Sequence, residues 1–190
     1  MKNILCIIRF DKNLDIKASH YNLSDFGFFY KEPVKEFLIF GCKEICRRLN
    51  DERLIIVDLN SDEYRDKMAS LRLDRAQCNI SMLENEKICI VTREPFPLRV
   101  LNNMIEEITL GNYELDYVAN NYDKVEEVDK ITQINNDLEE TKQVLITSIE
   151  KMLERGEKIE DLVEKSEYLS NSSKTFAIKA KKLNRCCIIL

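Results

Sequence analysis

The sequence predicts an α+β fold, in which one antiparallel sheet is flanked by helices and followed by a long coiled-coil helix. Short strand-like runs and two amphipathic helix patterns alternate within the first 125 residues, as in an α+β domain. Residues 131–183 instead repeat apolar and small side chains every three or four positions. We therefore expect a folded domain at 1–125, a linker at 126–130, a coiled-coil motif at 131–185 and a C-terminal tail at 186–190.

The expected domain begins with a strand at 3–10 and a weaker hairpin partner at 15–21. Pro33 suits the first position of a helix, because its missing N–H would have no partner there in any case. The core face of this helix recurs at three- and four-residue spacing: Val34, Phe37, Leu38, Cys42, Ile45 and Leu49.

Further strands and a second helix complete the expected domain. Strand candidates lie at 68–73, 78–83 and 87–92. Residues 54–59 form either another short strand or part of an insertion loop at 52–66. Pro97 begins the second helix and Gly111 is placed to end it. Its apolar face contains Val100, Leu101, Met104, Ile105 and Ile108.

The composition argues against an enzyme, a cofactor or metal site, and a nucleic-acid partner. The 190 residues include 4 glycines and 1 histidine, too few for the usual nucleotide-binding enzyme or for His-based metal or nucleophile chemistry. The histidine, His20, stands alone in an expected strand and is interpreted as a surface residue. The 29 Lys and Arg against 34 Asp and Glu, a net charge of -5, favour no nucleic acid.

The seven cysteines indicate a reducing environment. Their number is odd and no signal peptide precedes them, which predicts a cytoplasmic location. Cys42 and Cys46 lie one helical turn apart in an apolar pattern, with no further metal ligands evident nearby, so we expect buried structural thiols. No stretch approaches the ~20 apolar residues of a membrane span.

The periodic segment carries a narrow stripe along its whole length. The stripe contains Ile131, Ile134, Leu138, Thr141, Leu145, Ser148, Met152, Arg155, Ile159, Leu162, Ser166, Leu169, Ser173, Phe176, Ala180 and Leu183. Such a long and narrow stripe is typical of a coiled-coil seam. At 1.5 Å per residue the helix would be about 80 Å long.

Arg155 is the one charged residue of this seam. A different register would place Glu or Lys at many core positions, so the pattern keeps Arg155 in the seam. Two such arginines would meet in a homodimer, whereas Gln side-chain carbonyls on other helices could accept from the guanidinium without a second charge. The seam therefore predicts unlike partner helices. The polar surface and Gly156, which costs about 1 kcal/mol of helix propensity, predict a helix that orders on partner binding.

The C-terminus carries a lipidation signal. The last four residues, Cys187–Leu190, fit the Cys-aliphatic-aliphatic-X prenylation motif, and Leu at X favours geranylgeranyl over farnesyl. One lipid chain is a marginal anchor, so Cys186 is the natural site of a second, palmitoyl or prenyl. No acidic residue follows Glu167, and the five Lys and Arg residues after it can attract an anionic membrane surface.

Together these features resemble an R-SNARE of the longin type. The stretches Leu138–Lys142 and Met152–Val163 are similar to the R-SNARE core, with Arg155 as its central ionic layer. The Cys-Cys tail narrows the resemblance to the prenylated synaptobrevin homologues (YKT-type). Tyr21–Phe29 and Val34–Phe40 are similar to the region around the first helix of that family's longin domain.

The resemblance implies a longin (profilin-like) domain and a role in vesicular transport. It implies that the seam zips with three Gln-SNARE helices into a four-helix bundle that drives membrane fusion, and that a disassembly ATPase with its adaptor takes the bundle apart. The expected SNARE-core residues are Leu145, Met152, Ile159, Leu162, Leu169, Phe176 and Leu183. We expect cycling between the cytoplasm and Golgi, ER, endosomal or vacuolar membranes through a peripheral lipid anchor.

The resemblance also implies a soluble closed form, in which the longin domain folds onto the SNARE segment and the lipid tail. Phe37 and Phe40 are candidates for an autoinhibitory groove. For Phe37 the alternative is a place in the domain core, whereas Phe40 lies off the main apolar face.

Two other functions deserve comparison with a fusion SNARE. The tail alone suggests a prenylated small GTPase, but the chain contains no Gly-x-x-x-x-Gly-Lys-Ser/Thr loop. A non-fusogenic lipid-anchored coiled-coil tether would use the helix as a scaffold. Such a tether should tolerate the loss of Arg155, which a SNARE should not.

Overall fold

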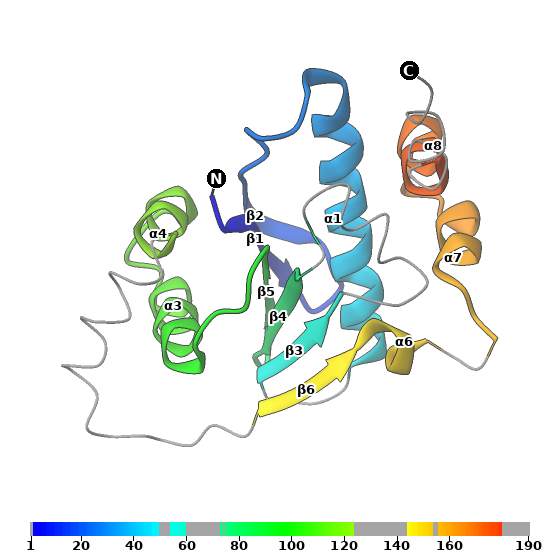
Figure 1. Cartoon of the computed structure of the whole chain (residues 1–190). Helices are drawn as coiled ribbons and strands as arrows, with labels where there is room; N and C mark the ends of the chain where they lie inside the picture. Colours follow the sequence, from blue (N-terminus) through cyan, green and yellow to red (C-terminus); the bar gives the residue numbers. More distant parts are fainter. Residues whose placement is uncertain are drawn as a thin grey trace.

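A computed structural model of the chain describes residues 2–49, 54–59, 73, 75–123, 144–153 and 156–179 (Figure 1). Its elements in order are β1 (Ile4–Asp11), β2 (Ile16–Tyr21), α1 (Phe28–Arg48), β3 (Leu54–Asp58), β4 (Gln77–Met82), β5 (Glu86–Thr92), α3 (Leu98–Leu110), α4 (Leu115–Tyr122), β6 (Val144–Ser148), α6 (Ile149–Met152), α7 (Ile159–Lys165) and α8 (Asn171–Lys179).

The described strands form one sheet with helices on both faces. The strand order is β2-β1-β5-β4-β3-β6, with α1 against one face and α3 and α4 against the other (Figure 1). Alternate residues of β1 serve the two layers: Ile8 and Phe10 pack on the α1 side, Ile4 and Ile7 on the α3 side. The predicted α+β class is confirmed.

The hairpin and the second helix follow the sequence pattern closely. β1 pairs antiparallel with β2 and with β5. The five residues of the predicted α3 face are all buried. Gly111 ends α3 with φ +67°, the left-handed conformation that glycine adopts without strain, and its N–H donates to the Glu107 carbonyl at 3.2 Å. The sequence did not predict α4, which packs on the same side of the sheet as α3.

The first helix begins five residues earlier than predicted. It starts at Phe28, so Pro33 lies inside α1 rather than at its first position. The additional turn has tertiary support, since the Tyr30 ring contacts Phe176 of α8 with centroids 5.8 Å apart. The Tyr30 N–H also donates to the Gly27 carbonyl at 2.8 Å. Because Tyr30 and Phe176 are 146 positions apart, the residues around Tyr30 gave no indication that the helix starts this early.

The third strand of the chain comes from residues 54–58, one of the two alternatives left open by the pattern. Ile55 and Val57 are buried on the α1 side, and Leu54 and Ile56 on the other, as in a strand covered on both faces. The strand candidate at 68–73 lies outside the described residues except for Leu73, which is buried and not in a strand. The remainder of the 52–66 insertion also lies mainly outside them.

The described part of the coiled-coil segment does not form one long helix in this structure. Residues 144–153 and 156–179 contain β6 and the short helices α6, α7 and α8. β6 pairs in parallel with β3, from Leu54 opposite Val144 to Asp58 opposite Ser148. The sheet is therefore mixed, whereas the sequence predicted a wholly antiparallel one. In the absence of partner helices, the apolar seam packs on the chain's own sheet domain, and β6 pairs with the open edge of β3.

Candidate functional site

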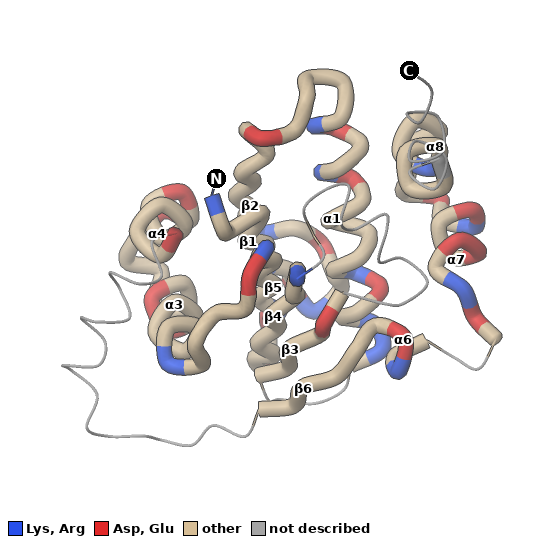
Figure 2. Tube along the Cα trace, viewed as in Figure 1, with Lys and Arg blue, Asp and Glu red and all other residues tan. Residues whose placement is uncertain are grey.

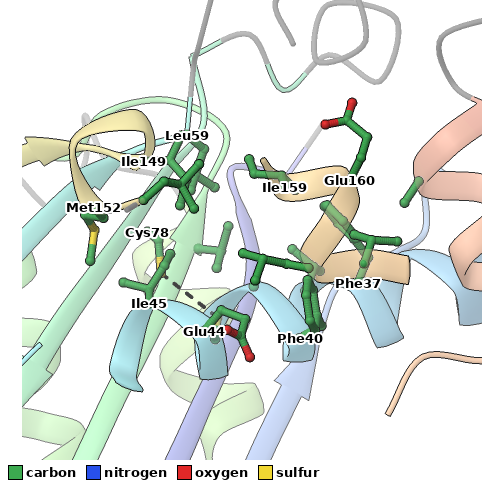
Figure 3. A pocket seen from close by; sticks show the side chains of 18 of the residues that line it. Phe37, Phe40, Glu44, Ile45, Leu59, Cys78, Ile149, Met152, Ile159 and Glu160 are labelled. Carbon is green, nitrogen blue, oxygen red and sulfur yellow. Dashed lines mark hydrogen bonds between the residues drawn. The ribbon is translucent and has the colours of Figure 1, made fainter. Parts of the chain in front are cut away.

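An apolar cavity of about 140 Å³ lies between α1, the sheet and the C-terminal segment, and we name it the α1 groove (Figure 3). Its lining includes Phe37, Leu38, Phe40, Cys42 and Ile45 of α1, Leu59, Cys78 and Val91 around the sheet, and Ile149, Met152, Ile159, Leu162, Val163 and Phe176 of the C-terminal segment. These positions are brought together because α8 lies along α1 (Figure 1). The groove is thus enclosed by residues from both predicted parts of the chain.

Phe37 and Phe40 face the C-terminal segment rather than the sheet (Figure 3). Phe40 is 6% exposed and packs with Val163 and Leu169, whereas Phe37 is partly buried against the same cluster. Their ring centroids lie 6.4 Å apart. The helical period separates the two rings from Leu38, which points to the sheet core. Phe37 therefore does not occupy the domain core, which was the alternative left open by the sequence.

The structure gathers most of the predicted SNARE-core residues against α1. Ile159, Leu162 and Leu169 pack around Phe40, and Met152 and Phe176 pack at the edge of the main core. Leu145 lies apart from them on β6 and is 36% exposed. The predicted residues Arg155, Leu183, Cys186 and Cys187 lie outside the described residues.

Two polar contacts join the C-terminal segment to α1. The Ser170 N–H donates to the Glu36 carboxylate at 2.9 Å, and the Arg48 guanidinium donates to Glu157 at 3.0 Å. Burial alone would raise the pKa of Glu36, but hydrogen bonds from Ser170 and Ser173 lower it overall. The pKa of Arg48 is raised, because Glu44 and Glu157 outweigh the opposing effect of burial.

These polar residues were missed by the sequence analysis. Glu36 and Ser170 are 134 positions apart, and Arg48 and Glu157 are 109 apart. Each residue taken alone resembles any exposed helix residue, and no local spacing indicates its partner. Only the docking of the C-terminal segment on α1 brings them together.

Cys42 and Cys46 are buried, as predicted, together with Cys6, Cys78 and Cys89, and of these Cys42 and Cys78 line the α1 groove. The Cys42 and Cys78 Sγ atoms lie 4.0 Å apart, and those of Cys46 and Cys89 lie 3.3 Å apart. Burial raises the pKa of the neighbouring Cys6 thiol well above its ordinary value, which keeps that thiol neutral. Within the described ranges, no group of His, Cys, Asp and Glu side chains is arranged to hold a metal.

His20 differs from its interpretation as a surface residue. Its side chain is 15% exposed and its Nδ1 lies 3.1 Å from Asp116 of α4. Burial under this helix lowers the pKa of His20, although Asp116 acts in the opposite direction. The difference arises because α4 was not predicted, and the contact lies outside the α1 groove.

Comparison with known proteins finds relatives that match nearly the whole chain. The synaptobrevin family model matches residues 130–189. The synaptobrevin homolog ykt6 of Schizosaccharomyces pombe is 32% identical over 202 residues and is covered, like this chain, to 96%. The synaptobrevin homolog YKT6 of Debaryomyces hansenii is 30% identical to this chain, and the match covers 95% of this chain and 94% of the relative. The synaptobrevin homolog YKT6 of Saccharomyces cerevisiae is 31% identical, and the match covers 89% of this chain and 88% of the relative.

The matches extend over both the sheet domain and the segment that packs on it. Among the helices that the structure describes, none is both long and apolar enough to cross a bilayer. Proteins of the matched family act with SNARE partners, are not enzymes and need no cofactor. The chain belongs to the Ykt6 family of synaptobrevin homologues, which are R-SNAREs of vesicular transport.

Proposed function

We propose that this chain contributes one helix to a four-helix trans-SNARE bundle that drives membrane fusion, and that the structure is its closed, inactive form. The observation that supports this most strongly is the position of the seam. Ile159, Leu162 and Leu169, which would face partner helices, instead pack around Phe40. A side chain cannot occupy both environments, so assembly requires release from α1. Phe37 and Phe40 then act as the autoinhibitory surface.

The active form divides as the sequence pattern suggests: a longin domain at 1–125, a linker at 126–130, an R-SNARE motif at 131–185 and a lipidated tail at 186–190. Arg155 is the central ionic layer of the SNARE core. The core itself consists of Leu145, Met152, Ile159, Leu162, Leu169, Phe176 and Leu183. The Arg155 guanidinium donates to Gln carbonyls of three Gln-SNARE helices, which satisfies its N–H groups without a second buried charge. A SNARE disassembly ATPase and its adaptor return the chain to the free state.

The lipid anchor completes this cycle. Cys187 carries a prenyl group and Cys186 a second lipid, palmitoyl or prenyl, because one chain alone binds membranes marginally. The apolar lining of the α1 groove suits a hydrocarbon chain, so the closed form can shelter the prenyl group in the cytoplasm. Release exposes both the seam and the anchor at a Golgi, ER, endosomal or vacuolar membrane. The basic residues before Cys186 add attraction to an anionic leaflet.

Assembly with three Gln-SNARE helices tests the proposal. The full chain should form an SDS-resistant, highly helical complex with them, and the absence of such a complex would rule out a fusion SNARE. Arg155→Ala should lose register or resist disassembly. Lys158→Ala, a matched loss of an exposed cation three residues away, should assemble and disassemble as the wild type does.

The same pair of variants separates the SNARE from the alternative, a non-fusogenic lipid-anchored tether. A tether should retain its function in both variants, because it needs no ionic layer.

For the anchor, mass spectrometry of the native C-terminal peptide should find a prenyl group on Cys187 and identify the lipid on Cys186. Cys187→Ser should remove the chain from membranes, and unchanged membrane binding of this variant would contradict the anchor.

A further inference from the structure

Two tyrosines form an exposed, stacked pair where α3 leads into α4. The rings of Tyr113 and Tyr117 have centroids 4.8 Å apart and an interplanar angle of 26°. Tyr113 is 51% exposed, Tyr117 is 54% exposed, and Leu110 at the end of α3 is 63% exposed. Single exposed apolar residues are common, but three large ones within 110–117 gather at the connection between two helices. We name these three side chains the α3–α4 patch.

The start of α4 holds the patch in place. Tyr113 precedes the N-cap residue Glu114, and Tyr117 lies in the first turn of the helix. Side chains four positions apart meet on one side of a helix, which accounts for the stacking. Val118 and Ala119 are buried toward the sheet, so the helical period turns the tyrosines toward solvent. Because the rings are already held on a folded helix, binding orders few additional groups.

The patch lies away from the docked C-terminal segment. α3 and α4 cover the face of the sheet opposite to α1, and α4 contacts β1 and β2 (Figure 1). β6 pairs with the other edge of the sheet, and α7 and α8 lie on the α1 side (Figure 1). The C-terminal elements that the structure describes therefore leave the patch uncovered.

The charges around the patch are acidic. Residues 100–123 contain no Lys or Arg, and Figure 2 shows acidic positions in both α3 and α4. Three carboxylates on these two helices and at the start of α4 are exposed: Glu106, Glu114 and Asp116. Such a surface repels the phosphates of an anionic leaflet or of nucleic acid and attracts a cationic peptide.

We propose that the α3–α4 patch binds a short, arginine-containing segment of a partner protein. A guanidinium is planar, so it stacks on a tyrosine ring while it donates to a neighbouring carboxylate. Three side chains form a surface far smaller than the total of about 1,000 Å² that a stable protein interface needs, so the occupant is a short segment that binds reversibly. This contact uses neither the seam nor the lipid anchor and is thus separate from SNARE assembly.

A synthetic peptide tests the proposal on the full-length chain. Fluorescence anisotropy compares fluorescein-labelled Arg-Leu-Arg-Leu-Arg with the matched Glu-Leu-Glu-Leu-Glu. The arginine peptide should bind and the glutamate peptide should not. In NMR spectra, the amide shifts caused by the arginine peptide should centre on 110–117. Equal binding of the two peptides, no binding of the arginine peptide, or shifts centred on α1 would each overturn the proposal.

Loss of the rings supplies the second measurement. The double change Tyr113→Ser and Tyr117→Ser should weaken binding of the arginine peptide at least about fivefold, since exposed cation–π contacts are lost. Phe28→Ser with Phe29→Ser removes an exposed pair of rings from α1 and should keep the affinity. Equal affinities of the two double variants argue against the site. Dimerisation of the wild type that the tyrosine change abolishes would assign the patch to a second copy and also overturn the proposal.

A change of charge tests the site without removing a ring, and so remains decisive if the tyrosine variant is unfolded by circular dichroism. Glu114→Gln should weaken binding of the arginine peptide about two- to fivefold and reduce its dependence on salt. Glu84→Gln, an exposed carboxylate in the turn between β4 and β5, should have no effect. Equal effects of the two changes would mean that only the net charge of the chain attracts the peptide, which overturns the α3–α4 patch.

Discussion

At the scale of single residues, Phe40 decides how the C-terminal segment meets α1. Phe40 lies beside the face of α1 that packs on the sheet, and it is buried because Val163 and Leu169 cover it. Its burial therefore belongs to the closed form and not to the domain alone. Removing its ring should affect docking much more than folding.

We expect Phe40→Ser to weaken docking by about 3–5 kcal/mol, as in other losses of a buried aromatic ring. Amide hydrogen exchange should accelerate in 159–179 while β1 and β5 keep their protection. Tyr117→Ser, which removes an exposed ring from α4, is the control and should leave exchange unchanged. Acceleration throughout the sheet would mean that Phe40 supports the fold itself.

Glu36 makes docking sensitive to acid. Its pKa is lowered in the closed form from an ordinary value of 4.5, although burial opposes the hydrogen bonds from the serines. Docking is therefore favoured while the carboxylate is ionised, and this contribution is lost as the pH falls through the lowered pKa.

In a fluorescence titration with labels on α1 and α8, the wild type should detach progressively below about pH 4.5. Glu36→Gln should bind less tightly at neutral pH and lack this part of the acid transition, because an amide does not titrate. Glu32→Gln, a change of an exposed carboxylate one turn earlier, serves as the control. Superimposable profiles of wild type and Glu36→Gln would contradict the role of Glu36.

At the scale of elements, the residues of β6 form a strand here and would be part of a helix in the proposed bundle. Val144, Ile146 and Thr147 are β-branched, which favours the strand that pairs with β3. Leu145 and Ser148 also belong to the three-and-four repeat of the seam, which favours a helix. The two structures exclude each other, so pairing with β3 competes with assembly of the helix.

The double change Ile146→Ala and Thr147→Ala should favour the helix. Ile146 is 68% exposed and neither residue belongs to the seam, so bundle contacts are kept. Helix propensity rises by about 1 kcal/mol in total, which should accelerate assembly with Gln-SNARE helices several-fold in stopped-flow measurements. Thr175→Ala lies in α8, which is already helical, and should have a much smaller effect. Equal rates for both variants would show that β6 does not limit assembly.

At the scale of the whole molecule, the proposed closed form is shorter than a chain with an extended helix. A continuous helix over 131–183 would be about 80 Å long, whereas the described C-terminal elements lie against the sheet and α1 (Figure 1). Small-angle scattering should therefore give a maximum dimension well below that of a domain with an extended helix. Addition of three Gln-SNARE helices should increase both this dimension and the helical circular dichroism.

The prenylated chain provides the sharper comparison. If the α1 groove shelters the lipid, prenylation should keep the chain compact, and Phe40→Ser should lengthen it. A prenylated wild type with the dimensions of a domain that carries an extended helix would contradict a lipid-stabilised closed form.

Several elements were predictable because their signals are local. The α3 face and Gly111, the β1–β2 hairpin and the buried cysteines of α1 follow from periodicity and backbone preference within a few residues. The start of α1, the presence of α4 and the role of 54–58 as β3 were less accessible. Tyr30, for example, gains its support from Phe176 at the far end of the chain.

The sequence by itself determined the α+β class, the seam with Arg155 and the Cys-Cys tail, since each depends on residue type and spacing alone. The tertiary structure decided which surface covers the seam in the absence of partner helices. An apolar stripe needs a partner but does not specify one, and the contacts of Glu36, Phe40 and Arg48 join positions more than 100 residues apart. Such contacts depend on the free-energy balance between two alternative packings, which no local pattern records.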